Sequence, residues 1–224
     1  MGWKEFFHKT FESEWNEGKN WGGLYPVILN IGEEQYYCVG YASSEPADWV
    51  FSPKIQIPQG VKVRITIRYF FWVVANAYGT ASIGIMFYKD GESAKDVEGH
   101  NVFGASHTPK QVPTSNLAEK HVLVMEYDGT NKITWYADDK KLGEAILELP
   151  LVSFVVGVAV KEASGGDVGI LIYEVVGEYY DMWEDWVNQL YGIMQWIVPI
   201  MFVIMFIPMI VSILRSPRKS KEER

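Results

Sequence analysis

Alternation of apolar and polar side chains is strongest along residues 61–73, where every odd-numbered position is aliphatic or aromatic. This period of two predicts a long β-strand with one buried face. The same pattern predicts further strands at residues 82–89, 121–127, 132–137, 152–161 and 168–178. Asp-Gly pairs at 90–91 and 128–129 and the Gly-Gly pair at 165–166 are interpreted as hairpin turns. No long helical pattern separates these strands, so we predict an antiparallel β-sandwich.

Residues 2–17 carry aromatic side chains at spacings of three and four, with Trp3, Phe7 and Phe11 on one line and mostly acidic residues opposite. This spacing predicts an amphipathic helix within residues 1–20 that ends at Gly18. Helices that lie in a membrane interface favour Lys and Arg on the polar face. Because this polar face is net acidic, packing against the domain or a neighbouring subunit is favoured over the membrane interface.

Residues 196–214 form an apolar run that is interrupted only by Ser212. At about 1.5 Å per residue, such a run covers roughly 28 Å as a helix, which matches a bilayer core of about 30 Å. We therefore predict a transmembrane helix, with a buried core helix as the alternative. The residues assigned to the membrane anchor are Trp196, Phe202, Ile204, Phe206, Pro208 and Leu214, followed by Arg215, Arg218 and Lys219 of the tail.

The tail, residues 215–224, carries five basic and two acidic side chains, whereas Asp181, Glu184 and Asp185 lie before the span. Positive flanks remain on the cytoplasmic side of a membrane. The sequence therefore predicts a cytoplasmic tail, with the N-terminal part on the opposite side or on the equivalent face of a virion membrane. The N-terminal residues do not have the basic and apolar regions of a signal peptide.

A short helical stalk is predicted at residues 181–195, between the sandwich and the span. Trp183, Trp186, Leu190 and Ile193 recur there at spacings of three and four. Such a seam predicts assembly into a homo-oligomer or with other subunits of a membrane complex. Aromatic side chains at this position would equally suit a belt at the membrane–water interface.

Two stretches, MEYDGTNKITWYADDKKLGEAILEL and VGVAVKEASGGDVGILIYEVVGEYY, resemble a hairpin and the closing strands of concanavalin A-like and laminin G-like jelly rolls. The resemblance covers roughly residues 38–180 and implies an all-β jelly-roll sandwich at residues 21–180. A different jelly roll, such as a viral coat barrel, is the alternative. The predicted chain is thus an N-terminal amphipathic helix, a jelly-roll sandwich, a stalk, a transmembrane helix and a basic tail.

The composition and the motifs of the chain argue against several classes of function. The chain has 224 residues and a formal net charge of −8, which argues against nucleic acid as a partner. One cysteine and four histidines without metal-ligand spacing predict neither a metal site nor a cofactor. No nucleophile elbow or phosphate-binding loop is present. Glu144 and Glu148 are too far apart along a strand for the carboxylate pair of a retaining glycosidase. We therefore expect no catalytic residues and no enzyme activity.

The longest connection, residues 89–120, contains His100, Asn101 and His107. Long loops on a rigid scaffold carry binding surfaces, so these residues are candidates for contacts with a ligand. Trp135 is a further candidate because an exposed indole could stack on a sugar, although a core position is the more common use of Trp. Two functions follow: a membrane-anchored structural protein that assembles with itself or other subunits, or a membrane-tethered lectin that binds a glycan.

Overall fold

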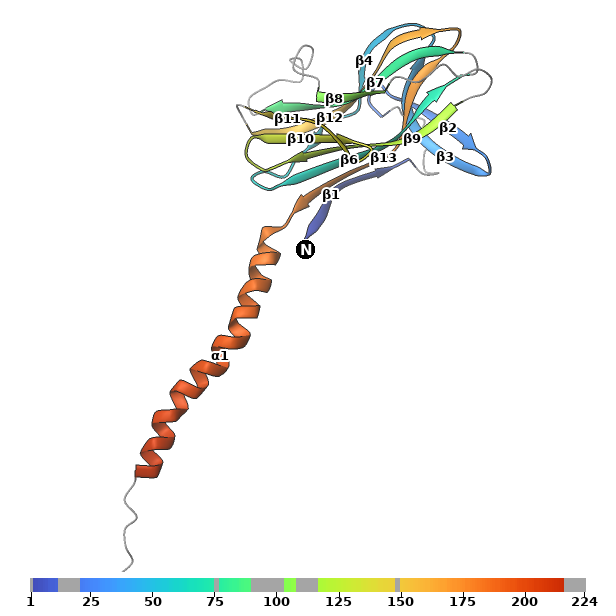
Figure 1. The fold of residues 1–224 in the computed structure, drawn as a ribbon. Helices are drawn as coiled ribbons and strands as arrows, with labels where there is room; N and C mark the ends of the chain where they lie inside the picture. The colour runs from blue at the N-terminus through green and yellow to red at the C-terminus, as the bar shows by residue number, and fades with distance from the viewer. Residues whose placement is uncertain are drawn as a thin grey trace, which may run out of the picture. The chain divides into compact units, whose positions relative to one another are not determined.

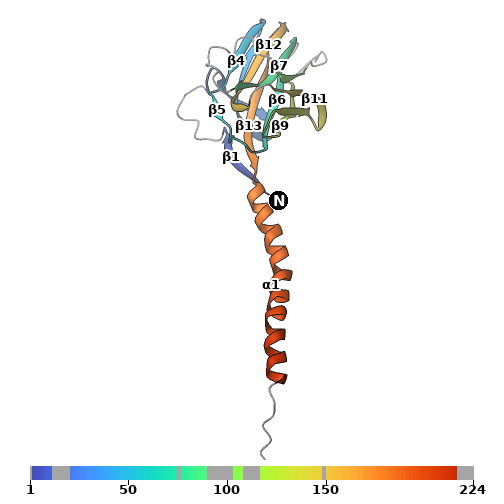
Figure 2. The same ribbon diagram turned by 90° about the vertical axis from the view of Figure 1, so that its left-hand side faces the viewer.

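The computed structural model describes residues 2–11, 21–74, 77–89, 103–107, 117–147 and 150–215. Two units are distinguished: residues 3–180 form one, and residues 181–224 with the two N-terminal residues form the other. The larger unit is an antiparallel jelly-roll sandwich of two sheets, and the smaller one contains a helix (Figures 1 and 2). The strands are β1 (Trp3–Thr10), β2 (Tyr25–Ile31), β3 (Glu34–Ser43), β4 (Ala47–Phe51), β5 (Ile55–Gln56), β6 (Val63–Val73), β7 (Tyr78–Lys89), β8 (Phe103–His107), β9 (Leu117–Tyr127), β10 (Lys132–Ala137), β11 (Lys140–Ile146), β12 (Leu151–Ser164) and β13 (Val168–Tyr180).

The larger sheet has eight strands in the order β11-β10-β9-β6-β13-β3-β2, with β1 added beside β13. Strand β13 is paired along both edges, because β6 lies on one side while β3 and then β1 lie on the other. The smaller sheet has five strands, β4-β12-β7-β8 with β5 beside β12. All of these pairs are antiparallel, as the alternating pattern predicts.

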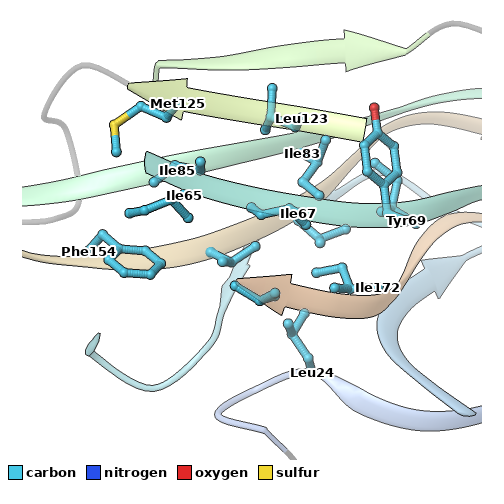
Figure 3. Packing of buried hydrophobic residues seen from close by; sticks show 14 of the residues in the cluster. Leu24, Ile65, Ile67, Tyr69, Ile83, Ile85, Leu123, Met125, Phe154 and Ile172 are labelled. Atoms are coloured by element: carbon cyan, nitrogen blue, oxygen red, sulfur yellow. The ribbon is translucent and has the colours of Figure 1, made fainter. Parts of the chain in front are cut away.

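The core lies between the two sheets. Odd-numbered side chains of β6 point into it, from Val63 to Val73, and meet buried side chains of β7 and β12 such as Ile83 and Phe154. Figure 3 shows this packing around Ile65, Ile67 and Phe154. The even-numbered residues of β6 consequently lie on the outer face of the larger sheet. The alternation of residues 61–73 thus fixes both which side is core and which side is available for a site.

The N-terminal segment is a strand, so the predicted amphipathic helix is wrong. Strand β1 pairs with the second half of β13, from Trp3 opposite Tyr180 to Thr10 opposite Glu174. Its register shifts between Glu5 and Phe7. A bulge of this kind adds a residue to one strand and changes the alternation of faces, so the aromatic residues of this segment do not follow the period of two that marks a strand. The sandwich therefore begins at residue 3 rather than at residue 21.

The turns are of two kinds. The Asp128-Gly129 pair connects the neighbouring strands β9 and β10, as predicted. Gly165 and Gly166, both with positive φ, connect β12 to β13, which belong to different sheets. Their interpretation as a hairpin turn is therefore wrong, because a glycine pair marks a reversal of the chain without specifying which strand lies next to it. The Asp90-Gly91 pair lies outside the described residues.

Helix α1 runs from Met182 to Arg215 and includes Pro199 and Pro208. The Asp181 carboxylate accepts a hydrogen bond from the Trp183 backbone N–H at 3.0 Å, as a helix-capping residue does. The segment Trp186–Leu214 is long and apolar enough to cross a membrane, and none of its most apolar part is buried within the chain. The described residues therefore do not form the alternative, a buried core helix. The division into a stalk and a span at residue 196 stays a prediction.

Two glycines with the same φ of +69° test the packing of the sandwich. A Cβ at Gly22 would lie 2.2 Å from the Phe51 carbonyl oxygen, whereas one at Gly60 would meet nothing within 4 Å. Both Gly→Ala variants incur about 1–2 kcal/mol of left-handed backbone strain. We expect Gly22→Ala to destabilise the sandwich by about 2 kcal/mol more, because overpacking is added. Equal losses in denaturant titrations of the two variants would contradict this close approach.

Candidate functional site

The outer face of the larger sheet presents polar side chains in rows across neighbouring strands. In one row, Arg64 of β6 lies opposite Glu126 of β9 on one side and opposite Glu178 of β13 on the other. Two residues along β6, Thr66 lies between Val124 and Val176. Directly opposed side chains on one face of a sheet lie close enough to interact. Strand pairing thus gathers residues that are more than 50 positions apart in sequence.

These rows line a groove of about 510 Å³. Its walls come from four neighbouring strands, β6, β9, β10 and β13, and from the turn after β10. The lining residues are Arg64, Thr66, Arg68, Val122, Val124, Glu126, Tyr136, Asp139 and Glu178. The volume falls within the range of about 300–1,000 Å³ that is typical of small-molecule sites. The groove is therefore a candidate site in the described part of the chain.

Both arginines of the groove are held by carboxylates. Glu126 accepts hydrogen bonds from Nε of Arg64 at 3.0 Å and from its terminal nitrogen at 2.7 Å. Arg68 donates to Glu174, which also bonds the His8 ring at 3.1 Å. The guanidinium group of Arg64 also stacks on the Trp3 ring, 4.2 Å from its centroid. These contacts fix the direction of both guanidinium groups and neutralise much of their charge.

Two further carboxylates line the groove, Asp139 and Glu178, and Glu178 lies opposite Arg64 without bonding it. The side-chain carboxylates of these two residues make no hydrogen bond or ion pair with the residues that the structure describes. Ionised carboxylates accept hydrogen bonds but cannot donate them. These two side chains are therefore available to accept hydrogen bonds from a ligand, and Arg64 and Arg68 retain donor N–H groups beyond those used by their carboxylates.

Two other acidic residues, Asp128 and Asp138, accept hydrogen bonds from backbone N–H groups. Asp128 accepts hydrogen bonds from the backbone N–H groups of Thr130, Asn131 and Lys132 at 2.8–3.0 Å. Partial burial raises the pKa of the Asp128 carboxyl, but these donors outweigh burial and hold its pKa below the ordinary value. Asp138 accepts a hydrogen bond from the Val122 backbone N–H at 2.9 Å and bonds the His121 ring at 2.8 Å. Within the described ranges, no group of three or more His, Cys, Asp and Glu side chains could hold a metal.

An aromatic cluster, formed by Tyr36, Phe70 and Tyr173, continues the outer face beyond Arg68. The rings of Tyr36 and Tyr173 each lie 4.9 Å from the ring of Phe70, centroid to centroid. Lys120 donates a hydrogen bond of 2.5 Å to the Tyr36 hydroxyl. Beneath these rings, burial raises the pKa of the Cys38 thiol to about 12, so this cysteine is a packing residue rather than a nucleophile. The groove thus lies beside a partly exposed aromatic surface.

Of the candidate residues selected from the sequence, the described ones, Trp135, His107 and Glu144, do not line this groove. Trp135 packs against the core from the inner face of β10, while its neighbour Tyr136 lines the groove from the outer face. His107 belongs to β8, an edge strand of the smaller sheet. His100, Asn101 and Glu148 lie outside the described residues. Glu144 is exposed, and Lys141 and Lys132 donate to it at 2.6 and 3.1 Å and hold its pKa below the ordinary value.

The groove was not predicted from the sequence, although the alternating pattern contained part of the signal. The pattern of residues 61–73 leaves the even-numbered positions on the unburied face of the strand, and Arg64, Thr66 and Arg68 are among them, but the pattern assigns no function to that face. The missing information was the strand order, because Glu126 and Glu178 face these residues only once β9 and β13 flank β6.

No protein-family model matches the chain, and no curated protein is similar to it in sequence. Solved structures with a similar fold include the catalytic domain of an endo-1,3-beta-glucanase (laminarinase) from Thermotoga petrophila RKU-1, at 15% identity and a TM-score of 0.46 over 81% of this chain and 99% of that one. Another is the carbohydrate recognition domain of Emp46p, at 9% identity and a TM-score of 0.42 over 79% and 98%. At these TM-scores and identities, neither likeness assigns a role to a residue of this chain.

The expectation that the chain has no enzyme activity requires correction. The similar structures include enzymes, among them the laminarinase domain and a carbohydrate esterase of the Shiga toxin-encoding bacteriophage phi24B, at 16% identity and a TM-score of 0.46 over 80% of this chain and all of that one. This likeness is one of fold alone. Because one fold can carry both binding and catalytic sites, the lack of a familiar catalytic motif does not exclude catalysis.

Proposed function

We propose that this chain is a membrane-anchored glycan-binding protein and that its ligand lies in the groove on the outer face of the larger sheet. The groove carries the proposal because it combines a volume suited to a small ligand with fixed arginine donors and two available carboxylate acceptors. A sugar presents many hydroxyl groups, each of which donates and accepts hydrogen bonds. Convergent polar side chains on a rigid sheet suit such a ligand better than an apolar one.

The long apolar helix supports the part of the proposal that locates the protein at a bilayer. Segment Trp186–Leu214 is long enough to span the hydrocarbon core, and its side chains are exposed in the chain alone. The basic tail supports a cytoplasmic C-terminus, with the groove on the other side of the membrane or of a virion envelope. Protection of the sandwich from protease in sealed vesicles is expected for this orientation, and complete digestion from the cytoplasmic side would exclude it.

A structural role through assembly is a second candidate. Trp183, Trp186, Leu190 and Ile193 are 75%, 59%, 40% and 53% exposed in the single chain. Exposed apolar side chains at helical spacing favour a helix–helix interface, and the same tryptophans suit a membrane-interface belt. The mass of the detergent-solubilised particle distinguishes an interface from a belt. A homo-oligomer or a complex with other subunits has more than the mass of one chain, whereas a protein whose tryptophans only form a belt has the mass of one chain.

Glycan binding is tested by filling the groove. We expect the full-length protein in detergent to retain at least one class of glycan on an array. Thr66→Tyr should reduce its affinity at least tenfold, because a phenol at the centre of the groove occupies the ligand's volume. Thr80→Tyr, the same change in β7 of the smaller sheet, is the matched control and should bind as the unaltered protein does. Absence of glycan binding, or equal binding by the Thr66→Tyr variant, would refute the proposal. Mass analysis of the bound glycan after incubation distinguishes binding from turnover.

A further inference from the structure

The turn between β10 and β11 has an unusual composition for its backbone. Ala137 pairs with Lys140, so Asp138 and Asp139 form a two-residue hairpin loop. Their φ angles are +47° and +63°. Loops with positive φ at both positions strongly favour Asn-Gly, Asp-Gly or Gly-Gly, because a glycine avoids the left-handed strain of a side chain. An aspartate at the second position, Asp139, is not the residue that the turn itself favours.

The two aspartates of this turn serve different purposes. Asp138 satisfies the Val122 backbone N–H and bonds His121, which ties the turn to β9. Asp139 makes no comparable bond within the described part of the chain, is exposed, and lines the groove. The hairpin therefore accounts for Asp138 but not for Asp139. A contact between its carboxylate and a ligand in the groove explains why an aspartate, and not a glycine, lies at this position of positive φ.

Glu178 lies on the opposite side of the groove. Strands β13, β6, β9 and β10 are consecutive neighbours in the sheet. At about 4.8 Å per spacing, Glu178 of β13 is therefore roughly 14 Å across the sheet from β10 and its turn. The positive charges between them are largely neutralised, because Arg64 bonds Glu126 and Arg68 bonds Glu174. Three carboxylates (Glu126, Asp139 and Glu178) and two guanidinium groups (Arg64 and Arg68) line the groove, so the formal charge of its lining is 2 − 3 = −1.

We propose that Asp139 and Glu178 make this groove selective for neutral saccharides over acidic ones. This inference rests on the proposed glycan binding. Carboxylates accept charge-assisted hydrogen bonds from sugar hydroxyls and repel the carboxylate or sulfate of an acidic sugar. Asp139 and Glu178 are specificity residues in this proposal.

The test uses full-length protein in detergent and two matched panels, neutral oligosaccharides and the same oligosaccharides carrying a uronic or sialic acid. The unaltered protein should prefer the neutral panel. Asp139→Asn and Glu178→Gln should each lower the ratio of neutral to acidic affinity by about fivefold or more, since the amide keeps the shape and removes the charge. Asp167→Asn, in the β12–β13 turn away from the groove, is the matched control and should leave the ratio unchanged.

Asp139→Gly adds a readout that a purely structural role would not give. Glycine adopts this positive φ without strain, so the melting temperature should rise. Because the carboxylate is lost, the affinity for neutral glycans should fall. The inference would be overturned if the unaltered protein preferred acidic glycans, or if both charge variants left the ratio unchanged. The proposed glycan binding would still stand in that case, provided that Thr66→Tyr removes binding. If the unaltered protein binds no glycan, the proposed function fails and this inference fails with it.

Discussion

Two arginines in the middle of the apolar segment should release the protein from membranes. Phe202 and Phe206 stack on one face of α1, with ring centroids 6.2 Å apart. An arginine near the centre of a spanning helix costs about 2.5–3.5 kcal/mol of insertion free energy, so Phe202→Arg with Phe206→Arg costs roughly 5–7 kcal/mol. We expect the doubly substituted chain to move from the membrane pellet to the alkaline supernatant after carbonate extraction.

The control places the same two charges at the end of the helix. In Ile213→Arg with Leu214→Arg, the new side chains extend toward the headgroups beside Arg215, which lowers their cost. This variant should remain in the pellet with the unaltered protein. The membrane anchor would be disproved if the unaltered full-length chain stayed in solution without detergent, or if both double variants fractionated alike.

Truncation of one buried ring should produce the largest loss of stability in the sandwich. Phe154 of β12 is fully buried in the core between the sheets (Figure 3). Replacing a buried phenylalanine with alanine removes its transfer free energy and leaves a cavity, at a cost of about 3–5 kcal/mol. We expect Phe154→Ala to lower the unfolding free energy by this amount, measured by denaturant titration of the full chain in detergent micelles.

Ile146 of β11 supplies the comparison for that measurement. Its side chain is 76% exposed at an edge of the larger sheet. Ile146→Ala should change the unfolding free energy by no more than about 0.5 kcal/mol, as is usual for surface substitutions. Similar losses for Phe154→Ala and Ile146→Ala would show that the inner face of β12 does not form the core.

The sequence predicted the strands well where one face of the sheet is buried. Residues 132–137 were bounded as they occur in β10, and the long alternating run became β6 with a start shifted to Val63. Alternation is informative there because each step along a strand moves a side chain to the opposite face. The N-terminal strand escaped the same reasoning because the register shift of β1 breaks the alternation.

The groove could not be predicted from one strand at a time. Arg64, Glu126 and Glu178 come from three strands whose neighbour relations depend on the whole sheet order. Trp135 shows the reverse case, since its aromatic side chain suggested a ligand and the structure packs it against the core, while its role in binding stays a prediction. In a sandwich, the role of a residue depends less on its type than on the face of the sheet where it lies and on the residues opposite it in the paired strands.

The position of β13 also determines how the molecule carries mechanical load. The strand ends at Tyr180, and only Asp181 separates it from the start of the helix. Because β13 bonds β6 along one edge and β3 and β1 along the other, tension entering the chain at Tyr180 is resisted by ladders on both sides. A tether attached to a peripheral strand would instead be opposed by a single ladder. A force applied between the helix and the sandwich therefore loads a strand that is bonded along both of its edges.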